Sequence, residues 1–451
     1  MKYASPVVLL FLFLAPWSAE AAAPSPSPAI AASVQEITEA YVKLVLAMGQ
    51  HDPDYVDAYY GPPDWKKQEK KPLDAIARDA TRLLDQLTKI PKSTAEMEQL
   101  RCRYLTKQLS ALQARVRMLN GANLKFDEES QALYDAVAPS FPDAHFQEIL
   151  ARLEPKLPGD GPLLQRYEKW RQAFVIPKDK LDTVFQLAIK ACRERTLAHI
   201  KLPSDENFSV EYVTNKPWGG YNWYRGNYHS VIQVNTDLPV YIDRAIDLAA
   251  HEGYPGHHVY NALLEKNLVR DRGWVEFSVY ALFSPQSLIA EGTANFGRDV
   301  VFTKPERLEF EKKVLWPAAG IDPSRVEEFY GVQDLVKKLG YATNEPPGGI
   351  SMAILTQTPQ RPGCKNTRSW TKNVRNNPRN SSRSTAATSS TTISAKIWCA
   401  VTSRNAAARR INRSSAGANL SNYWRRLGCR GTYARTNKNP GDCSRHGSLY
   451  S

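Results

Sequence analysis

Apolar residues recur at helical spacing through the first half of the chain. Leu100, Leu105, Leu109, Leu112 and Val116 lie near one face of a predicted helix, residues 93–119, that a Ser93-x-x-Glu96 capping box opens and Asn120-Gly121 ends. A second predicted helix covers residues 178–199, with Leu181, Val184, Phe185 and Ile189 as its apolar positions and Pro203 after it. Residues 30–200 are therefore expected to form a mainly helical layer, and they show no internal repeat.

The pattern changes near Asn207. An aromatic, glycine-rich stretch covers residues 219–224, and the alternating residues 230–235 predict a short strand. A helix is expected from about Tyr241 into His251, and two more at residues 305–316 and 323–339, the last with Asp322 as cap and Pro323 at its first position. The expected fold class is mainly α, with a small β-sheet beside the site that the histidines suggest.

The N-terminus has the three parts of a signal peptide. Lys2 is the positive region, residues 7–14 are an unbroken apolar run, and Ala19-Glu20-Ala21 gives the cleavage pattern. The run is too short to span a bilayer, so we expect cleavage, no stable membrane insertion, and a periplasmic or secreted protein. Export permits a disulfide between Cys102 and Cys192, although two free buried thiols fit equally well.

The net charge of +13 comes from the C-terminal end of the chain. Residues 351–451 hold 18 of the 59 Lys and Arg but one of the 46 acidic residues, Asp442. A nucleic-acid footprint is expected on a folded face, so we expect no nucleic-acid partner. The hydrophobic periodicity also ends near Glu345. This tail has two interpretations, a disordered basic extension or a frameshifted sequence that was never selected to fold.

Three of the eight histidines lie within one stretch of eight residues, His251-Glu252-Gly253-Tyr254-Pro255-Gly256-His257-His258. In an undisturbed helix His251 and His257 would point about 120° apart, and His258 would lie about 10 Å along the axis from His251. Neither pair would then share an ion. Pro255 breaks the helical bonding and the glycines permit unusual backbone angles, so a bulge is expected to return the second histidine, His257 or His258, to the first.

A third metal ligand is available on a later predicted helix. Glu291 lies among apolar and small residues, where an unpaired carboxylate would be costly. Asn295 follows one turn later, where it is expected to orient a ligand. Two neutral imidazoles and a carboxylate form a typical catalytic zinc site, and Glu252 is the candidate base beside the bound water. The cofactor expected from these residues is Zn²⁺.

His251 to His258, together with Ala290-Glu291-Gly292-x-Ala294, resemble the bacterial domain of unknown function 885 family, which is similar to the gluzincin zinc metallopeptidases. The resemblance covers residues 34–345. It implies a gluzincin-like fold, His251, His257 and Glu291 as metal ligands, and Glu252 as general base. The wider spacing departs from the gluzincin pattern, so His258 remains the alternative ligand. Relatives continue past Asn344-Glu345 with helices, whereas this chain has the tail.

These arguments divide the chain into a signal peptide (1–23), a helical region (24–206), a metallopeptidase-like catalytic region (207–345) and the basic tail (346–451). The expected function is an exported zinc metallopeptidase acting on a peptide substrate. The alternatives are a zinc hydrolase of another small amide or ester, or a metal-binding protein without turnover. The sequence does not indicate an oligomeric state.

Three side chains are candidates to stabilise the oxyanion of a peptidase reaction, namely Tyr254, His229 and Tyr280. The strand at residues 230–235 is expected to pair with an extended peptide by strand addition. Nearby aromatic side chains are candidates to line the substrate site: Trp218, Trp223 and Tyr224.

Overall fold

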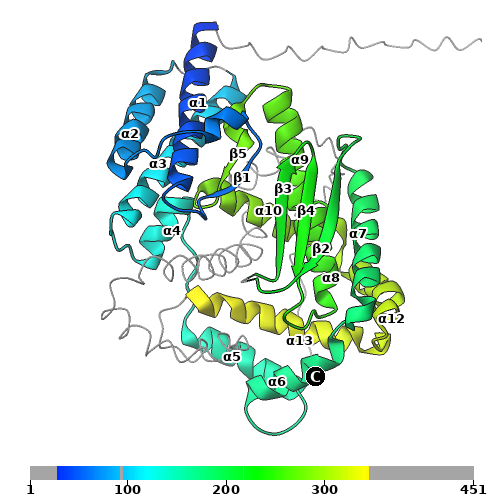
Figure 1. Cartoon of the computed structure of the whole chain (residues 1–451). Coiled ribbons are helices and arrows are strands. Elements are labelled where there is room, and N and C mark those ends of the chain that lie inside the picture. Colours follow the sequence, from blue (N-terminus) through cyan, green and yellow to red (C-terminus); the bar gives the residue numbers. More distant parts are fainter. Residues whose placement is uncertain (1–27, 92–94, 217, 345–451) are drawn as a thin grey trace, which may run out of the picture.

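A computed structural model describes residues 28–91, 95–216 and 218–344 (Figure 1). The described chain is mainly helical with two small sheets, as the pattern predicts. The proposed signal peptide and the basic tail lie outside the described residues. Among the described residues, no helix has the length and apolar character needed to cross a membrane.

The four N-terminal helices pack against one another. They are α1 (Pro28–Gly49), α2 (Leu73–Lys89), α3 (Glu96–Leu119) and α4 (Phe126–Tyr134). The apolar positions predicted for α3 are buried from Leu105 onward, and the helix ends where expected, before Gly121 with a φ of +94°. Ser93 of the predicted capping box lies outside the described residues, and α3 begins after Ala95.

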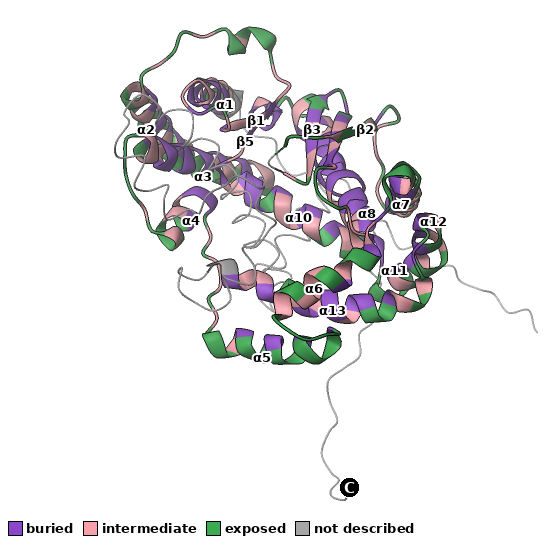
Figure 2. Cartoon of the chain, turned by 60° about the horizontal axis from the view of Figure 1, so that its bottom comes forward, coloured by how far each residue is buried: buried purple, intermediate pink, exposed green. Residues whose placement is uncertain are grey.

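A second helical group contains the larger aromatic core. It consists of α5 (Asp143–Leu153), α6 (Leu163–Arg171), α7 (Leu181–Leu197), α11 (Lys304–Phe310), α12 (Trp316–Ala319) and α13 (Val326–Leu339). The ring centroids of Phe174 and Phe329 are 4.6 Å apart, and Trp170 and Trp316 pack on both. In Figure 2 most residues of α5 are exposed and most residues of α6 are partly buried, whereas these four rings lie in the core.

The predicted helix at residues 305–316 is interrupted. A π-helical turn, η8 (Glu311–Leu315), separates α11 from α12. The helix predicted at residues 323–339 is confirmed as a 3₁₀ turn (Pro323–Arg325) that leads into α13, and the Asp322 carboxylate accepts the backbone N–H of Ser324 at its start.

The larger sheet has three strands in the order β2-β4-β3. These are β2 (Asn207–Val213), β3 (Gly220–Gly226) and β4 (His229–Asn235); β4 runs parallel to β2 and antiparallel to β3. The prediction of β4 as a strand is confirmed, but both of its edges are already paired. The expected strand addition to residues 230–235 is therefore wrong, because β4 has no free edge.

The smaller sheet joins distant parts of the chain. Strand β1 (Val56–Tyr59) pairs antiparallel with β5 (Val279–Ala281). This pairing brings Asp57, from the N-terminal region, beside the segment that precedes the predicted Glu291 helix. The boundary predicted near residue 206 stays a prediction, and side chains from both sides of it, such as Phe185 and Ile246, pack in one core.

Two helical segments cross the centre of the molecule between these groups. The first contains α8 (Asp243–Leu248), the π-helical turn η5 (Ala249–Gly253), α9 (His257–Leu264) and the π-helical turn η6 (Glu265–Arg270). The second is α10 (Pro285–Val301), which runs behind the three-stranded sheet (Figure 1). Leu288 at one end of α10 and Val301 at the other belong to different core clusters, so α10 is firmly held.

The two cysteines that the structure describes are both free. Cys102 lies on α3 and is partly buried, whereas Cys192 lies on α7 and is fully buried. Of the two possibilities left open by the sequence, the structure therefore shows free thiols.

Candidate metal centre

The helix that carries His251 breaks where the proline and glycines predict. The regular turns of α8 widen into η5, and the N–H of Tyr254 donates to the carbonyl oxygen of Ala249 at 2.9 Å. A turn with a cis Tyr254–Pro255 peptide bond follows, and α9 begins at His257. The predicted bulge is confirmed.

Gly256 is required for this turn to close. A β-carbon added to it would lie 1.8 Å from the carbonyl oxygen of His251 and 2.4 Å from that of Ala250. Only glycine fits so close an approach between two backbone segments. The turn brings the imidazole centroids of His251 and His257 to 4.8 Å from each other.

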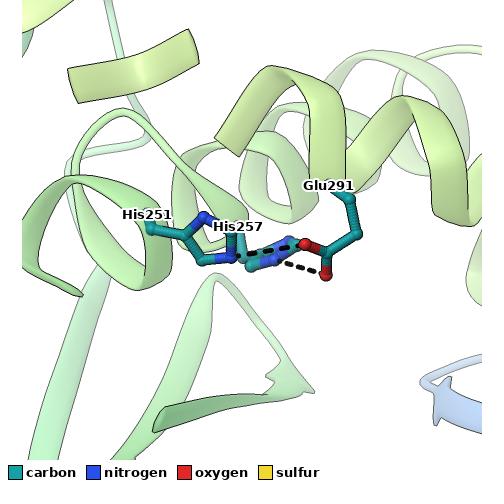
Figure 3. Close-up of side chains that lie close together, drawn as sticks. All are labelled: His251, His257 and Glu291. Atoms are coloured by element: carbon teal, nitrogen blue, oxygen red, sulfur yellow. Dashed lines mark ion pairs between the residues drawn. The ribbon is translucent and has the colours of Figure 1, made fainter. Parts of the chain in front are cut away.

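Glu291 on α10 completes a cluster of three donors (Figure 3). Its carboxylate oxygens lie 3.5 Å from Nε2 of His251 and 3.2 Å from Nε2 of His257. One ligand atom from each residue lies within 4.8 Å of the other two. Donors bound about 2.0–2.2 Å from one tetrahedral ion are separated by roughly 3.3–3.6 Å, so the three residues fit a metal ion.

Glu252 lies beside the cluster and is not part of it. Its Oε1 is 4.0 Å from Nε2 of His251, and its side chain is 7% exposed. Strand β3 anchors the Glu252 backbone: the Asn222 side-chain amide donates to the backbone carbonyl oxygen of Glu252 at 2.7 Å. Gly220 lies so close that a β-carbon there would be 3.4 Å from Oε1. The Glu252 carboxylate thus lies between His251 and Gly220 of β3.

The charges of the cluster shift the pKa values of His257 and Glu291 in opposite directions. Burial alone would lower the pKa of His257, but the Glu291 carboxylate, joined by the charges of Glu252 and Asp57, raises that pKa to about 9. Burial would raise the pKa of Glu291, but His257 and then His251 lower it to about 2. Near neutral pH the carboxylate is thus available as a ligand, whereas His257 must release a proton before it binds a cation.

The structure adds Asp57 and Tyr221, which sequence reasoning missed. The Tyr221 hydroxyl donates to the Asp57 carboxylate. Burial raises the pKa of Asp57 to about 6, with a hydrogen bond from Tyr221 and the charge of His257 opposing and those of Glu291 and Glu252 adding to the rise. No local motif marks these residues, because β1 and β3 meet only in the tertiary structure.

Tyr280 is the one of the three oxyanion candidates that lies near the cluster. Burial raises its pKa, and the charges of Asp57 and Glu291 raise it further. Its hydroxyl is 3.1 Å from the Ser287 hydroxyl. It therefore stays protonated at neutral pH and remains a hydrogen-bond donor.

Tyr254 and His229, the other two oxyanion candidates, make their hydrogen bonds outside the ligand cluster. The Tyr254 hydroxyl donates at 2.6 Å to Glu206, which is not part of the ligand cluster. His229 is exposed at the start of β4, and its Nδ1 lies 3.0 Å from the Asn227 carbonyl oxygen. Neither is brought to the cluster of His251, His257 and Glu291.

His258, the alternative ligand, has both ring nitrogens engaged. Nε2 lies 2.9 Å from Glu206, Nδ1 lies 2.9 Å from the Ser230 hydroxyl, and the side chain is fully buried. The structure thus groups His257, and not His258, with His251. The sequence left this choice open because it depends on Glu206 and Ser230, which lie far from His258 in the sequence.

Two further expectations are corrected. The Asn295 amide donates to the backbone carbonyl of Glu291 at 2.9 Å, so the contact that it makes is with the backbone of α10 and not with the carboxylate. Tyr224 is buried and donates to Glu265 at 2.6 Å. Trp218 and Trp223 remain partly exposed and pack on the two sides of Tyr221.

Comparison with known proteins adds no identification. No protein-family model, no curated protein and no solved structure matches the chain. The argument about function therefore depends on the geometry of the cluster and on the chemistry of its side chains.

Proposed function

We propose that this chain is an exported zinc metallopeptidase related to the domain of unknown function 885 family. One observation carries the proposal: His251 and His257, on the two sides of a broken helix, converge with Glu291 on α10, and a buried carboxylate, Glu252, lies beside them. Two imidazoles and one carboxylate are the ligand set of a common class of catalytic zinc sites, which keep a further position open for water.

Zinc held by these three residues would polarise a peptide carbonyl and lower the pKa of a water molecule toward about 7. We propose that Glu252 accepts the proton of the attacking water and then donates it to the leaving amine. The Asn222 amide anchors the Glu252 backbone to β3, and the Glu252 carboxylate lies beside Gly220 of that strand. Tyr280 is the donor that we propose for the oxyanion, because its hydroxyl stays protonated.

A peptide substrate suits the strand that passes the site. In the order β2-β4-β3, strand β3 is an edge of its sheet, and its Gly220 lies next to Glu252. Extended peptides bind such edges through backbone hydrogen bonds. We therefore propose that an extended peptide pairs with β3 and not with β4. Tyr221 and Trp223 are the aromatic side chains of β3 nearest to this edge.

The test separates metal binding from catalysis. Glu252→Gln keeps the shape of the side chain but removes its basicity, so peptide hydrolysis is expected to fall by about 10² to 10⁴-fold while one zinc stays bound. Glu148→Gln, at an exposed position on α5, is the matched control. Cleavage is measured by mass spectrometry on a peptide library, with small amides and esters beside it.

Three results would count against this proposal. Equal cleavage by wild type and Glu252→Gln would remove Glu252 from the mechanism. Cleavage of small esters or amides alone would make the protein another kind of zinc hydrolase. Stoichiometric zinc with no turnover of any substrate would make it a metal-binding protein. Sequencing of the mature N-terminus tests export, with cleavage expected after Ala21 or in the alanines that follow it.

A further inference from the structure

A second cluster of polar side chains contacts the metal-site turn through Tyr254 and His258, and its centre is Glu206. This residue precedes β2, and its side chain is 1% exposed. The Arg193 guanidinium, from α7, donates to Oε1 of Glu206 at 2.7 Å and to the Tyr254 hydroxyl at 3.3 Å. Glu206 is not a member of the metal-ligand cluster, and the mechanism proposed above does not use it.

The other carboxylate oxygen of Glu206 joins the two sides of the turn. Oε2 accepts the Tyr254 hydroxyl at 2.6 Å and lies 2.9 Å from Nε2 of His258. Tyr254 precedes the Pro255-Gly256 turn and His258 follows it. A single buried oxygen thus links Tyr254, between His251 and the turn, to His258, which directly follows His257.

The same two side chains are held against the large sheet. The Ser230 hydroxyl of β4 is 2.9 Å from Nδ1 of His258, and the ring of Phe208 on β2 packs on Tyr254 and His258 with centroid distances of 5.1 and 5.2 Å. With Nε2 donating to the carboxylate, Nδ1 accepts the serine hydroxyl, so every polar atom of the imidazole has a partner.

We infer that Glu206 is a positioning residue of the metal centre, acting through Tyr254 and His258 to hold His257 in place to share an ion with His251. The inference rests on the proposed metal site and deepens it. Because His257 directly precedes His258 in the first turn of α9, a shift of the His258 side chain moves the backbone that carries His257. Partners behind metal ligands typically change metal affinity by about 10 to 100-fold when they are removed.

The charge of Glu206 suits this role. Burial would raise its pKa, but hydrogen bonds from His258, Tyr254 and Arg193 lower it. The ionised carboxylate accepts hydrogen bonds at both oxygens and matches three donors. A glutamine of the same size would turn an NH₂ group toward at least one of these donors and leave it without an acceptor.

The experiment uses the full chain and Co²⁺ as the probe, because the visible absorption of bound Co²⁺ reports ligand geometry and chelator competition gives its dissociation constant. We expect Glu206→Gln to weaken Co²⁺ binding at least about tenfold and to change the visible spectrum. Tyr254→Phe removes one hydroxyl and is expected to act in the same direction with a smaller change. Thermal melts of the metal-free proteins measure general loss of stability.

Glu265→Gln is the matched control. Glu265 is also a buried carboxylate that accepts a tyrosine hydroxyl, from Tyr224 at 2.6 Å, and an arginine, from Arg270 at 2.6 Å, but it lies at the far end of α9. This change is expected to lower the melting temperature and to leave the Co²⁺ affinity and spectrum as in wild type.

The outcomes separate this inference from the proposed function. If Glu206→Gln and Tyr254→Phe bind Co²⁺ with wild-type affinity and spectrum, Glu206 is not a positioning residue. If the Glu206 variant does not fold, the Co²⁺ affinity and spectrum of Tyr254→Phe alone test the inference. If the wild-type protein itself binds no Co²⁺, the proposed metal centre is refuted, and so is this inference.

Discussion

Zinc binding is predicted to be strongly pH-dependent near neutrality. The pKa of His257 in the metal-free protein is raised to about 9 by Glu291, and an imidazole binds a metal only after it loses its proton. At pH 7 roughly one molecule in a hundred has a neutral His257, so the apparent affinity is about 100-fold below its limiting value. Between pH 7 and 8 the dissociation constant should fall about tenfold.

Chelator competition at fixed ionic strength measures this dependence, and calorimetry in two buffers of different ionisation enthalpy measures the protons released. We expect about one proton per zinc ion at pH 7. In Glu291→Gln the carboxylate that raises the His257 pKa is gone, so binding should be weaker but its pH dependence flatter. A wild-type affinity that is constant between pH 7 and 8, with no proton release, would refute the ion pair as the origin of the effect.

Two further predictions concern stability. Without metal, the His257–Glu291 pair stabilises the fold below the ordinary histidine pKa near 6.5, and this contribution, at most about 3 kcal/mol, is lost as pH rises through about 9. The free energies of unfolding in urea of chelator-treated wild type and Glu291→Gln should therefore differ most at pH 6 and least above pH 9. A difference that does not change with pH would contradict the pairing. Gly256→Ala should cost about 3 kcal/mol and abolish zinc binding, because its β-carbon meets two carbonyl oxygens, whereas Gly219→Ala, with open space around it, should stay within about 0.5 kcal/mol in the same urea experiment. Equal stability of these two glycine variants would show that the turn does not need Gly256.

The sequence predicted the metal-site turn because its chemistry is local. Pro255 cannot donate within a helix and Gly256 permits a close backbone approach, and these two properties are enough to predict a break between His251 and His257. The break does not by itself select His257 over His258. That choice depends on Glu206 and Ser230, which engage both nitrogens of His258 and lie far from it in sequence.

Other features needed the tertiary structure. Asp57 reaches the site only because β1 pairs with β5, and a strand of four residues carries too little pattern to predict that pairing. The alternation of residues 230–235 correctly predicted a strand but gave no sign that β4 lies between β2 and β3. Asn295 lies at helical spacing from Glu291, yet its amide bonds the helix backbone.

The central claim is that His251, His257 and Glu291 hold one metal ion, and metal content tests it most directly. Elemental analysis of protein equilibrated with limiting free zinc should give one ion per chain for wild type, and also for His199→Ala, a change at an exposed histidine that follows the end of α7. His251→Ala, His257→Ala and Glu291→Ala should each retain well under one ion. Full occupancy in all three variants, or none in the wild type, would contradict the account.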